Sequence, residues 1–460
     1  MLHDERGLPV STDSAVAAAK LDRAVESYLK FHADAPALLN AALTEDPDFV
    51  LAHCFRGYLL LSAANPANRP AIARVLAQAQ DKGGAVTPRE ARHVAAFAAW
   101  AGGKVDTAFA IWRDLLDRDP TDLMAVRICD TIWFRHGQTD TIREQADRLA
   151  PHWHADLPGY DCFQSVWAFA HEETGDHAAA EQAIDAVLEA DKFNYMGHHV
   201  KAHVMEMDCR PEEGSAWLEA RSGDWHKGNA LIHHLSWHRA LMQLDLGQNE
   251  AMLANYDANI RNFDDPMTRA TPDFSIDLSN AAALLWRLDQ LGFATGNRWE
   301  ELADKAEARI GETGHLLLVP HLMLALAATG RTEAARRFLE ALRAVARDTG
   351  LWTAPAIATV VVPVCEAALA HRQGRYADAA ALLEPCYPGF RPLGGSNAQR
   401  DMFTQMLLDA AVKSGRRELA ERMLAHETAT RAVPPAHRAG YAGAARTHLS
   451  SQTSSMRLPL

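Results

Sequence analysis

The chain has 460 residues, of which 46 are basic and 59 acidic, so its formal net charge is −13; 48% of the residues are hydrophobic. This acidic balance disfavours general nucleic-acid binding, which needs a basic surface to displace counterions. The length also exceeds that of one ordinary domain unless the chain is built from repeats.

The N-terminal stretch and the cysteine pattern predict a cytoplasmic protein. The sequence begins with "MLHDERGLPVST", which lacks the apolar centre of a signal peptide. No run of about 18 apolar residues occurs, so we expect no membrane span. The six cysteines are scattered without a C-x-x-C pair, as is typical of a reduced, cytosolic chain. Nucleic acids and membranes are therefore not expected as partners.

Helix starts are the clearest local signals along the chain. The stretch "TPRE" at 87–90 predicts a helix with Thr87 as its cap and Glu90 completing a capping box. The stretch "SNAQ" at 396–399 repeats this pattern with Ser396 and Gln399. No alternating strand pattern accompanies these signals, so the sequence predicts an all-α fold.

A glycine followed five residues later by an alanine recurs between helical patterns. This spacing predicts helical hairpins, because glycine permits a tight turn and a small alanine lets two helices approach closely. The pairs are Gly103/Ala108, Gly175/Ala180, Gly330/Ala335, Gly374/Ala379 and Gly415/Ala420. Further turns are expected at 137, near 209, at 247 and near 292, with a long irregular connection around 262–275.

The Gly, Ala and Pro spacing resembles that of tetratricopeptide repeats (TPRs). The stretches "GLPVST", "AHVMEM", "HLSWHRALMQLDLG" and "GGSNAQRDMF" are similar to the tetratricopeptide repeat protein 38 family. This resemblance implies a right-handed α-solenoid of degenerate hairpins and no particular reaction. We expect about nine or ten hairpins in one solenoid over residues 1–440, wound into a nearly closed shape, and a polar tail over residues 441–460.

The first of two histidine clusters lies in "HHVKAHVME" at 198–206. On a helix over 196–208, steps of four and seven residues rotate by about 40° and −20°. His199, His203 and Glu206 therefore share one face, whereas His198 points elsewhere.

The second cluster lies in "HHLSWH" at 233–238, on a helix predicted over 229–246. His234 and His238 share one face of this helix, and His233 and Trp237 lie on another side. Both clusters fall on the first helices of consecutive hairpins. Such helices stack side by side on the concave surface, about 8–10 Å apart, so the two pairs can meet.

Two i,i+4 histidine pairs on neighbouring helices can assemble a nitrogen site for a metal ion, or a general acid/base pocket. The predicted catalytic residues are His199, His203, Glu206, His234 and His238. The four histidines are the candidate ligands of a divalent metal such as zinc. The alternative is that these imidazoles fill a polar repeat interface without binding anything.

Other polar residues are expected on the same concave row and are candidates for ligand binding. They are Asp130, Asp161, Gln164, Asp277, His321, Glu366, Asn397 and Arg400. For Asp130 and Asp161 capping or a solvated face is the competing interpretation, and for His321 a satisfied core histidine. Arg400 near a helix start is unfavourable with the helix dipole, so we expect it either to hold a ligand anion or to pair with Glu366.

Two functions follow, and the sequence leaves both open. In the first, the concave face closes around a small molecule or metal, with hydrolytic or acid/base chemistry and with 262–275 and 386–396 as lids. In the second, a non-enzymatic scaffold binds a peptide or partner protein in an open groove. No nucleophile elbow, phosphate loop or dinucleotide-binding glycine motif occurs. The residues at the centre of the array are polar but carry little charge, and this favours the first function, a closed pocket for a small molecule or metal.

Overall fold

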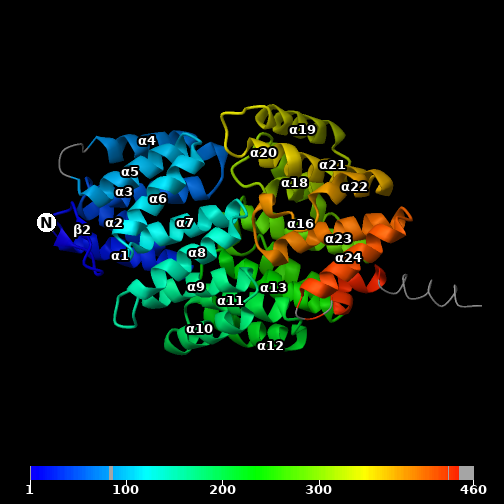
Figure 1. Ribbon diagram of the computed structural model, residues 1–460, viewed down its shortest axis with the longest axis horizontal. Coiled ribbons are helices and arrows are strands. Elements are labelled where there is room, and N and C mark those ends of the chain that lie inside the picture. The colour runs from blue at the N-terminus through cyan, green and yellow to red at the C-terminus, as the bar shows by residue number, and fades with distance from the viewer. Residues whose placement is uncertain (1, 82–85, 432, 434, 445–460) are drawn as a thin grey trace, which may run out of the picture.

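The computed structural model describes residues 2–81, 86–431, 433 and 435–444, and in this part of the chain nearly every element is a helix (Figure 1). The exception is one short antiparallel pair, β1 (Leu2–His3) and β2 (Pro9–Val10). The predicted all-α class is therefore confirmed.

The helices follow one another with short connections. Those of the N-terminal half are α1 (Ala15–Leu29), α2 (Ala35–Glu45), α3 (Val50–Ser62), α4 (Arg69–Gln80), α5 (Pro88–Ala101), α6 (Val105–Arg118), α7 (Leu123–Arg135), α8 (Thr139–Leu149), α9 (Tyr160–Glu173), α10 (His177–Ala190), α11 (Tyr195–Met207) and α12 (Pro211–Arg221). Those of the C-terminal half are α13 (Leu231–Asp245), α14 (Asn249–Asn255), α15 (Pro266–Ala270), α16 (Ser275–Gln290), α17 (Arg298–Ala308), α18 (Leu318–Ala328), α19 (Thr332–Ala346), α20 (Ala354–Ala356), α21 (Val362–Arg372), α22 (Tyr376–Leu383), α23 (Asn397–Lys413) and α24 (Arg417–Thr430).

Shorter helical segments connect or extend these helices. The 3-10 segments are η1 (Pro66–Asn68), η2 (Ala150–His152), η3 (Ser222–Lys227), η6 (Glu384–Cys386), η7 (Arg391–Leu393) and η8 (Pro435–His437). The π-helical segments are η4 (Tyr256–Ile260) and η5 (Ile357–Val361).

The turns lie where the glycines predict them. Gly103 and Gly175 have φ values of 76° and 89°, in the left-handed region where a side chain is strained. The turn expected near 209 uses Cys209 at φ 53°, a non-glycine in the same conformation. The alanines five residues after the repeat glycines are buried, as helix contact requires: Ala108, Ala180, Ala335, Ala379 and Ala420.

Both predicted capping boxes are present. The backbone N–H of Glu90 donates to Thr87 Oγ1 at 3.1 Å, and the N–H of Thr87 donates to Glu90 Oε2 at 2.9 Å. At the start of α23, the N–H of Gln399 donates to Ser396 Oγ at 3.2 Å, and the N–H of Ser396 returns to Gln399 Oε1 at 3.0 Å. These bonds satisfy backbone donors that have no partner inside the helix.

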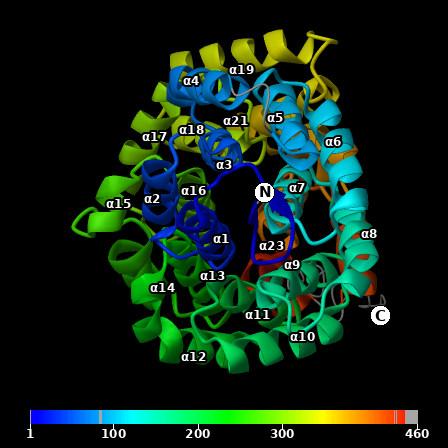
Figure 2. The ribbon, with the colours of Figure 1, turned by 90° about the vertical axis from the view of Figure 1, so that its left-hand side faces the viewer.

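Alternate helices form an inner and an outer row (Figure 2). Helices α7, α9, α11, α13, α16, α18 and α21 pack each against the next, and α8, α10, α12, α17 and α19 cover them from outside. Helix α23 lies inside this curve and contacts α11, α16 and α21. The histidine-bearing helices α11 and α13 are thus neighbours in the inner row, as the sequence predicts.

Two large hydrophobic clusters fill the molecule, and of the histidine helices α13 contributes buried residues to the second while α11 contributes none to either. One cluster runs from Val10 to Ala170 and the other from Trp237 to Tyr441. Two small clusters, around Phe169 and Tyr195, occupy the region of α9 to α13. The least continuous part of the apolar core is therefore the part that holds the histidines.

The chain termini close against this region. The backbone N–H of Tyr195 donates to Lys30 O at 3.2 Å and that of Asn229 to Phe31 O at 2.8 Å, so the N-terminal hairpin contacts the start of α11 and the segment before α13. At the other end Tyr441 is fully buried. The packed chain therefore extends past 440 to at least 444, and the remainder of the predicted tail, 445–460, lies outside the described residues.

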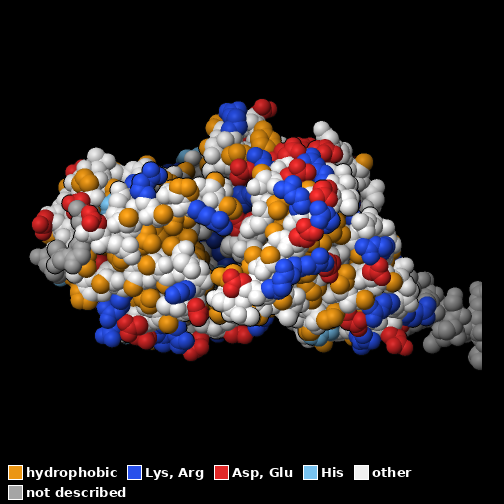
Figure 3. Space-filling view, turned by 90° about the horizontal axis from the view of Figure 1, so that it is seen from above, with side chains coloured by type: hydrophobic (Ala, Val, Ile, Leu, Met, Phe, Trp, Pro, Cys, Tyr) orange, Lys and Arg blue, Asp and Glu red, His pale blue; other side chains and the backbone are white. Residues whose placement is uncertain are grey.

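One continuous helix, Ala354–Arg372, has the length and mean hydropathy of a membrane span, 19 residues and 1.5, and 61% of its apolar window is buried inside the molecule. Such burial is typical of a core helix, and the inner-row packing of α21 accounts for its composition. On the face shown in Figure 3, acidic and basic side chains are interspersed, and a hollow separates the N-terminal helices from the C-terminal ones.

Candidate functional site

The two histidine pairs meet between α11 and α13. His199 Nε2 and His203 Nε2 are 3.0 Å apart. The ring centroids of His203 and His238 are 4.5 Å apart, and those of His199 and His234 are 4.9 Å apart. One ligand nitrogen from each of the four rings lies within 4.8 Å of the others. The predicted convergence of the two pairs is confirmed.

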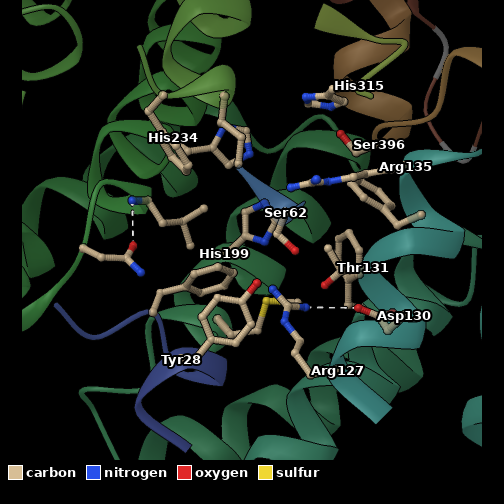
Figure 4. Close-up of a pocket in the computed structure, with 18 of the residues that line it drawn as sticks. Tyr28, Ser62, Arg127, Asp130, Thr131, Arg135, His199, His234, His315 and Ser396 are labelled. Atoms are coloured by element: carbon tan, nitrogen blue, oxygen red, sulfur yellow. Dashed lines mark hydrogen bonds and ion pairs between the residues drawn. The ribbon is translucent and has the colours of Figure 1, made fainter. Parts of the chain in front are cut away.

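A cavity of about 240 Å³ opens beside this cluster, which we call the histidine cavity. His199, His203 and His234 line it, together with the aromatic side chains Phe31 and Phe169. Figure 4 shows His199 and His234 pointing into the same space as residues of α7. The cluster therefore forms part of a cavity wall and is not sealed behind it.

The segments expected to act as lids supply part of the wall. Phe274 comes from the irregular connection over 262–275, and Ser396 ends the loop over 386–396. This second loop lies hard against α7, since a Cβ added to Gly394 would come within 2.0 Å of the Arg135 carbonyl oxygen. Only a glycine permits that approach.

Glu206 orients one histidine instead of sharing the cluster with it. His238 Nδ1–H donates to Glu206 Oε2 at 2.7 Å, so the buried Nε2 of His238 is left without a partner. Arg438 donates to the other carboxylate oxygen at 3.0 Å. A carboxylate that holds the far nitrogen of an imidazole is the usual outer partner of a metal-binding histidine.

A second pair of carboxylates lies behind His203. Its Nδ1 is 3.2 Å from Glu172 Oε2 and 3.7 Å from Glu173 Oε1, all three side chains being buried. These contacts leave His203 Nε2 facing His199. Both glutamates end helix α9, beside the turn at Gly175.

An amide holds the third histidine. The side chain of Asn280, from α16, lies 2.9 Å from His234 Nδ1. An amide offers both a donor and an acceptor, and when its oxygen accepts from Nδ1–H the lone pair of His234 is on Nε2. His199 Nδ1 has no partner within the described residues.

The surroundings keep three of the four imidazoles neutral. Burial, followed by the neighbouring imidazoles, lowers the pKa of His199, His234 and His238 well below its ordinary value. Burial also acts to lower the pKa of His203, but Glu172, Glu173 and Glu206 outweigh it and raise that pKa. Neutral imidazole is the form that binds metal ions.

Of the predicted ligand-binding residues, Asp130 alone lines the histidine cavity. Its carboxylate accepts from Arg127 Nη1 at 3.1 Å, and burial, opposed by Arg127, raises its pKa to about 6. His321 donates from Nδ1 to the Leu317 carbonyl at 2.7 Å, which agrees with the interpretation of a satisfied core histidine.

Three more of these residues lie away from the cavity. Asp161 pairs with Lys30 at 2.7 Å, and the buried Asp277 accepts from His233 Nδ1 at 2.9 Å. Gln164 is half-buried on α9 and does not line the cavity.

The expected Arg400–Glu366 ion pair is wrong. Glu366 pairs with Arg343 of the outer helix α19, and Arg400 lies 3.6 Å from Glu173 and donates to Asn397 Oδ1 at 2.7 Å. The two side chains lie on faces of α21 and α23 that point to different neighbours. Asn397 also binds the end of α9 through Glu173, so it serves helix packing and does not line the cavity.

Several residues of the site were not predicted from the sequence. Glu172, Glu173, Asn280 and Arg438 hold the cluster, and Arg135 lines the cavity. The adjacent pair Glu172–Glu173 inside an apolar helix was an available signal, because buried carboxylates need partners. Nothing in the local sequence marks Arg438, which acts across 232 residues.

A scan of the sequence against models of known protein families finds no match.

Proposed function

We propose that the protein is a TPR-like helical-repeat protein that binds a divalent metal ion through His199, His203, His234 and His238, at the wall of a cavity for a small molecule. The row of inner helices and the glycine turns support a right-handed α-solenoid over most of residues 1–440. The quoted sequence stretches support a relationship to the tetratricopeptide repeat protein 38 family.

The observation that carries the proposal is the convergence of four buried ring nitrogens within 4.8 Å of one another. Nitrogen ligands about 2.0–2.1 Å from a common tetrahedral ion lie about 3.4 Å apart, so the rings need to close by about 1 Å to share one. The backing of His238 by Glu206 and of His203 by Glu172 adds the outer partners that such ligands need. Within the described residues the buried Nε2 of His238 has no hydrogen-bond partner, which leaves a nitrogen available for an ion.

The donor set favours zinc or iron, because imidazole suits these ions. When bound, the ion would act as a Lewis acid toward a molecule in the cavity. The chain's own residues contribute the orientation of the rings, the neutral state of His199, His234 and His238, and a wall of aromatic side chains that limits water. Hydrolytic or acid/base activity is the reaction class that this arrangement suits.

A peptide groove has less support at this place. Residues 195–206 of α11 are all buried, so the inner surface that carries the histidines is closed in by α23 and the N-terminal hairpin. A peptide groove of this repeat type needs exposed Lys, Arg or Asn side chains on its first helices.

Elemental analysis of protein purified without a histidine tag tests the proposal. We expect about one zinc, manganese or iron ion per chain, lost in the His199→Ala/His238→Ala double variant. The matched control is His321→Gln, which removes a buried imidazole outside the cluster and should keep the metal.

Zinc titration of chelator-treated protein provides the second measurement. Wild type should bind one ion, and the double variant none at the same concentration. Folded wild type that takes up no zinc, manganese or iron, and whose melting temperature is the same with and without these ions, would refute the metal site.

A further inference from the structure

Arg135 places an uncompensated positive charge in the histidine cavity. It is the last residue of α7, and its side chain lines the cavity with His199 and His315. Among the described residues its guanidinium has no hydrogen bond and no ion pair. In Figure 4 this side chain leaves α7 and points into the same space as His199 and His234.

The other charges of the cavity are already balanced. Arg127 donates to Asp130 and stacks on Phe31, with its guanidinium carbon 5.1 Å from the ring centroid. His315 has its pKa held well below the ordinary value by burial and then by Arg135, so it is neutral. The surplus in the cavity is therefore the single charge of Arg135.

The protein only weakly compensates the positive charge of the Arg135 guanidinium. The C-terminal end of α7 carries about half a negative charge. Burial lowers the pKa of Arg135, with Arg127 adding to that effect and Tyr28 and Glu312 opposing it. The Arg135 side chain is half-buried and lines the cavity, and planar carboxylates are the groups that a guanidinium binds with two parallel hydrogen bonds.

Unused hydroxyl and ring donors surround the same end of the cavity. Ser62 Oγ, Thr131 Oγ1 and His315 Nδ1 are buried and lack a hydrogen-bond partner within the described residues. His315 itself is only 6% exposed. Beside them, Phe31, Phe134 and Phe169 give the cavity an apolar side.

We infer that the histidine cavity binds a small organic acid, with its carboxylate on Arg135 and its apolar body against the aromatic side chains. The single surplus charge matches a monoanion better than a phosphate dianion. The volume of about 240 Å³ lies below the about 300–1,000 Å³ of pockets for drug-sized molecules, so the ligand is small. This assignment rests on the proposed function and names its class of substrate.

The test compares 3-phenylpropionate with its neutral isostere 3-phenylpropanamide, by calorimetric titration of chelator-treated protein. Wild type should bind the acid at least about tenfold more tightly than the amide, the value of a single charged hydrogen bond of about 1.4 kcal/mol or more. Arg135→Gln should bind the two equally. Arg343→Gln, an exposed arginine outside the cavity, is the matched control and should behave as wild type.

Equal binding of acid and amide by wild type, or preference for the acid retained in Arg135→Gln, would overturn the inference. Tighter binding of 3-phenylpropyl phosphate than of the acid would overturn the carboxylate assignment. The ligand-free Arg135→Gln variant should melt at the same temperature as wild type or higher, because a half-buried charge without a partner is removed. A lower melting temperature would make Arg135 a structural residue and contradict the inference.

Metal content of the same preparations separates this inference from the proposed function. Acid binding through Arg135 without any metal uptake would leave the anion site standing and refute the metal site. Stoichiometric metal without acid binding would support the metal site and refute the anion site.

Discussion

Buried histidines occur in two kinds of surroundings in this molecule. His321 on α18 and His136 at the end of α7 each donate from Nδ1 to the carbonyl four residues earlier, at 2.7 Å. Each is satisfied by its own helix. In the cluster between α11 and α13, side chains of other helices contact the outer nitrogens of His203, His234 and His238, and the inner nitrogens face one another.

The difference separates histidines satisfied by their own helix from histidines that other helices hold in a cluster. A ring that bonds its own helix needs no partner beyond it, so it can occupy any apolar site. A ring held by a side chain from another helix is aimed in a fixed direction, and three of the four clustered rings are held so, two by carboxylates and one by an amide.

The largest expected effect is on metal-linked stability. Zinc at about 100 times its dissociation constant should stabilise wild type by about 2.7 kcal/mol. His203→Gln should lose this stabilisation, because its affinity falls by more than the about 10- to 100-fold that an outer partner contributes. Thermal unfolding with and without zinc measures it, and His136→Gln is the control. Equal stabilisation of both variants would erase the distinction between the two kinds of histidine.

Glu206→Gln should weaken zinc binding by about 10- to 100-fold, because His238 loses the carboxylate that fixes its direction. Competition with a chromogenic chelator gives the affinity. Glu366→Gln is the matched control, since that glutamate pairs with Arg343 outside the cavity. Unchanged affinity in Glu206→Gln would show that the carboxylate serves only Arg438.

Acid should lower the free energy of unfolding through the buried histidine that bonds its own helix, His321. Burial lowers the pKa of His321 to about 4, below its unfolded value of about 6.5. The unfolded chain therefore takes the proton first, so stability is complete above about pH 6.5 and falls as the pH drops toward 4. In metal-free protein His321→Gln should lose about 2 kcal/mol less than wild type between pH 7 and pH 5.

Urea unfolding at the two pH values measures this difference. The other buried histidines titrate in both proteins and cancel in the comparison. Parallel acid losses in the two proteins would mean that His321 titrates normally in the folded state.

The smallest effect is expected at the surface. Arg343→Gln breaks a pair whose arginine side chain is 48% exposed. Its loss should change the free energy of unfolding by less than about 1 kcal/mol and leave zinc affinity unaltered. Urea unfolding at neutral pH is the measurement, and a change above 2 kcal/mol would show that α19 and α21 depend on this pair.

The sequence predicts the helices well because their signals are local. Gly103 and Gly175 mark turns, and the Thr87 and Ser396 boxes mark helix starts within a few residues. It also predicts which imidazoles meet, since an i,i+4 pair fixes a helix face and consecutive hairpins place those faces side by side.

The outer partners could not be predicted in the same way. Asn280 and Arg438 reach the cluster from α16 and from the segment after α24, and no local spacing encodes those contacts. The expected Arg400–Glu366 pair failed for the related reason that helix periodicity does not say which neighbour each face meets. Glu206 was placed on the correct face but orients a ring through its far nitrogen.

The dependence of Glu206 on Arg438 has a consequence for biosynthesis. Arg438 follows the last long helix and contacts Glu206 across 232 residues of chain. During translation the four imidazoles leave the ribosome long before this guanidinium does, and helical hairpins fold as they emerge. Every nascent chain thus passes through a stage in which the histidines are present and Glu206 has not yet met Arg438, and the geometry of the cluster is complete only when the final residues dock.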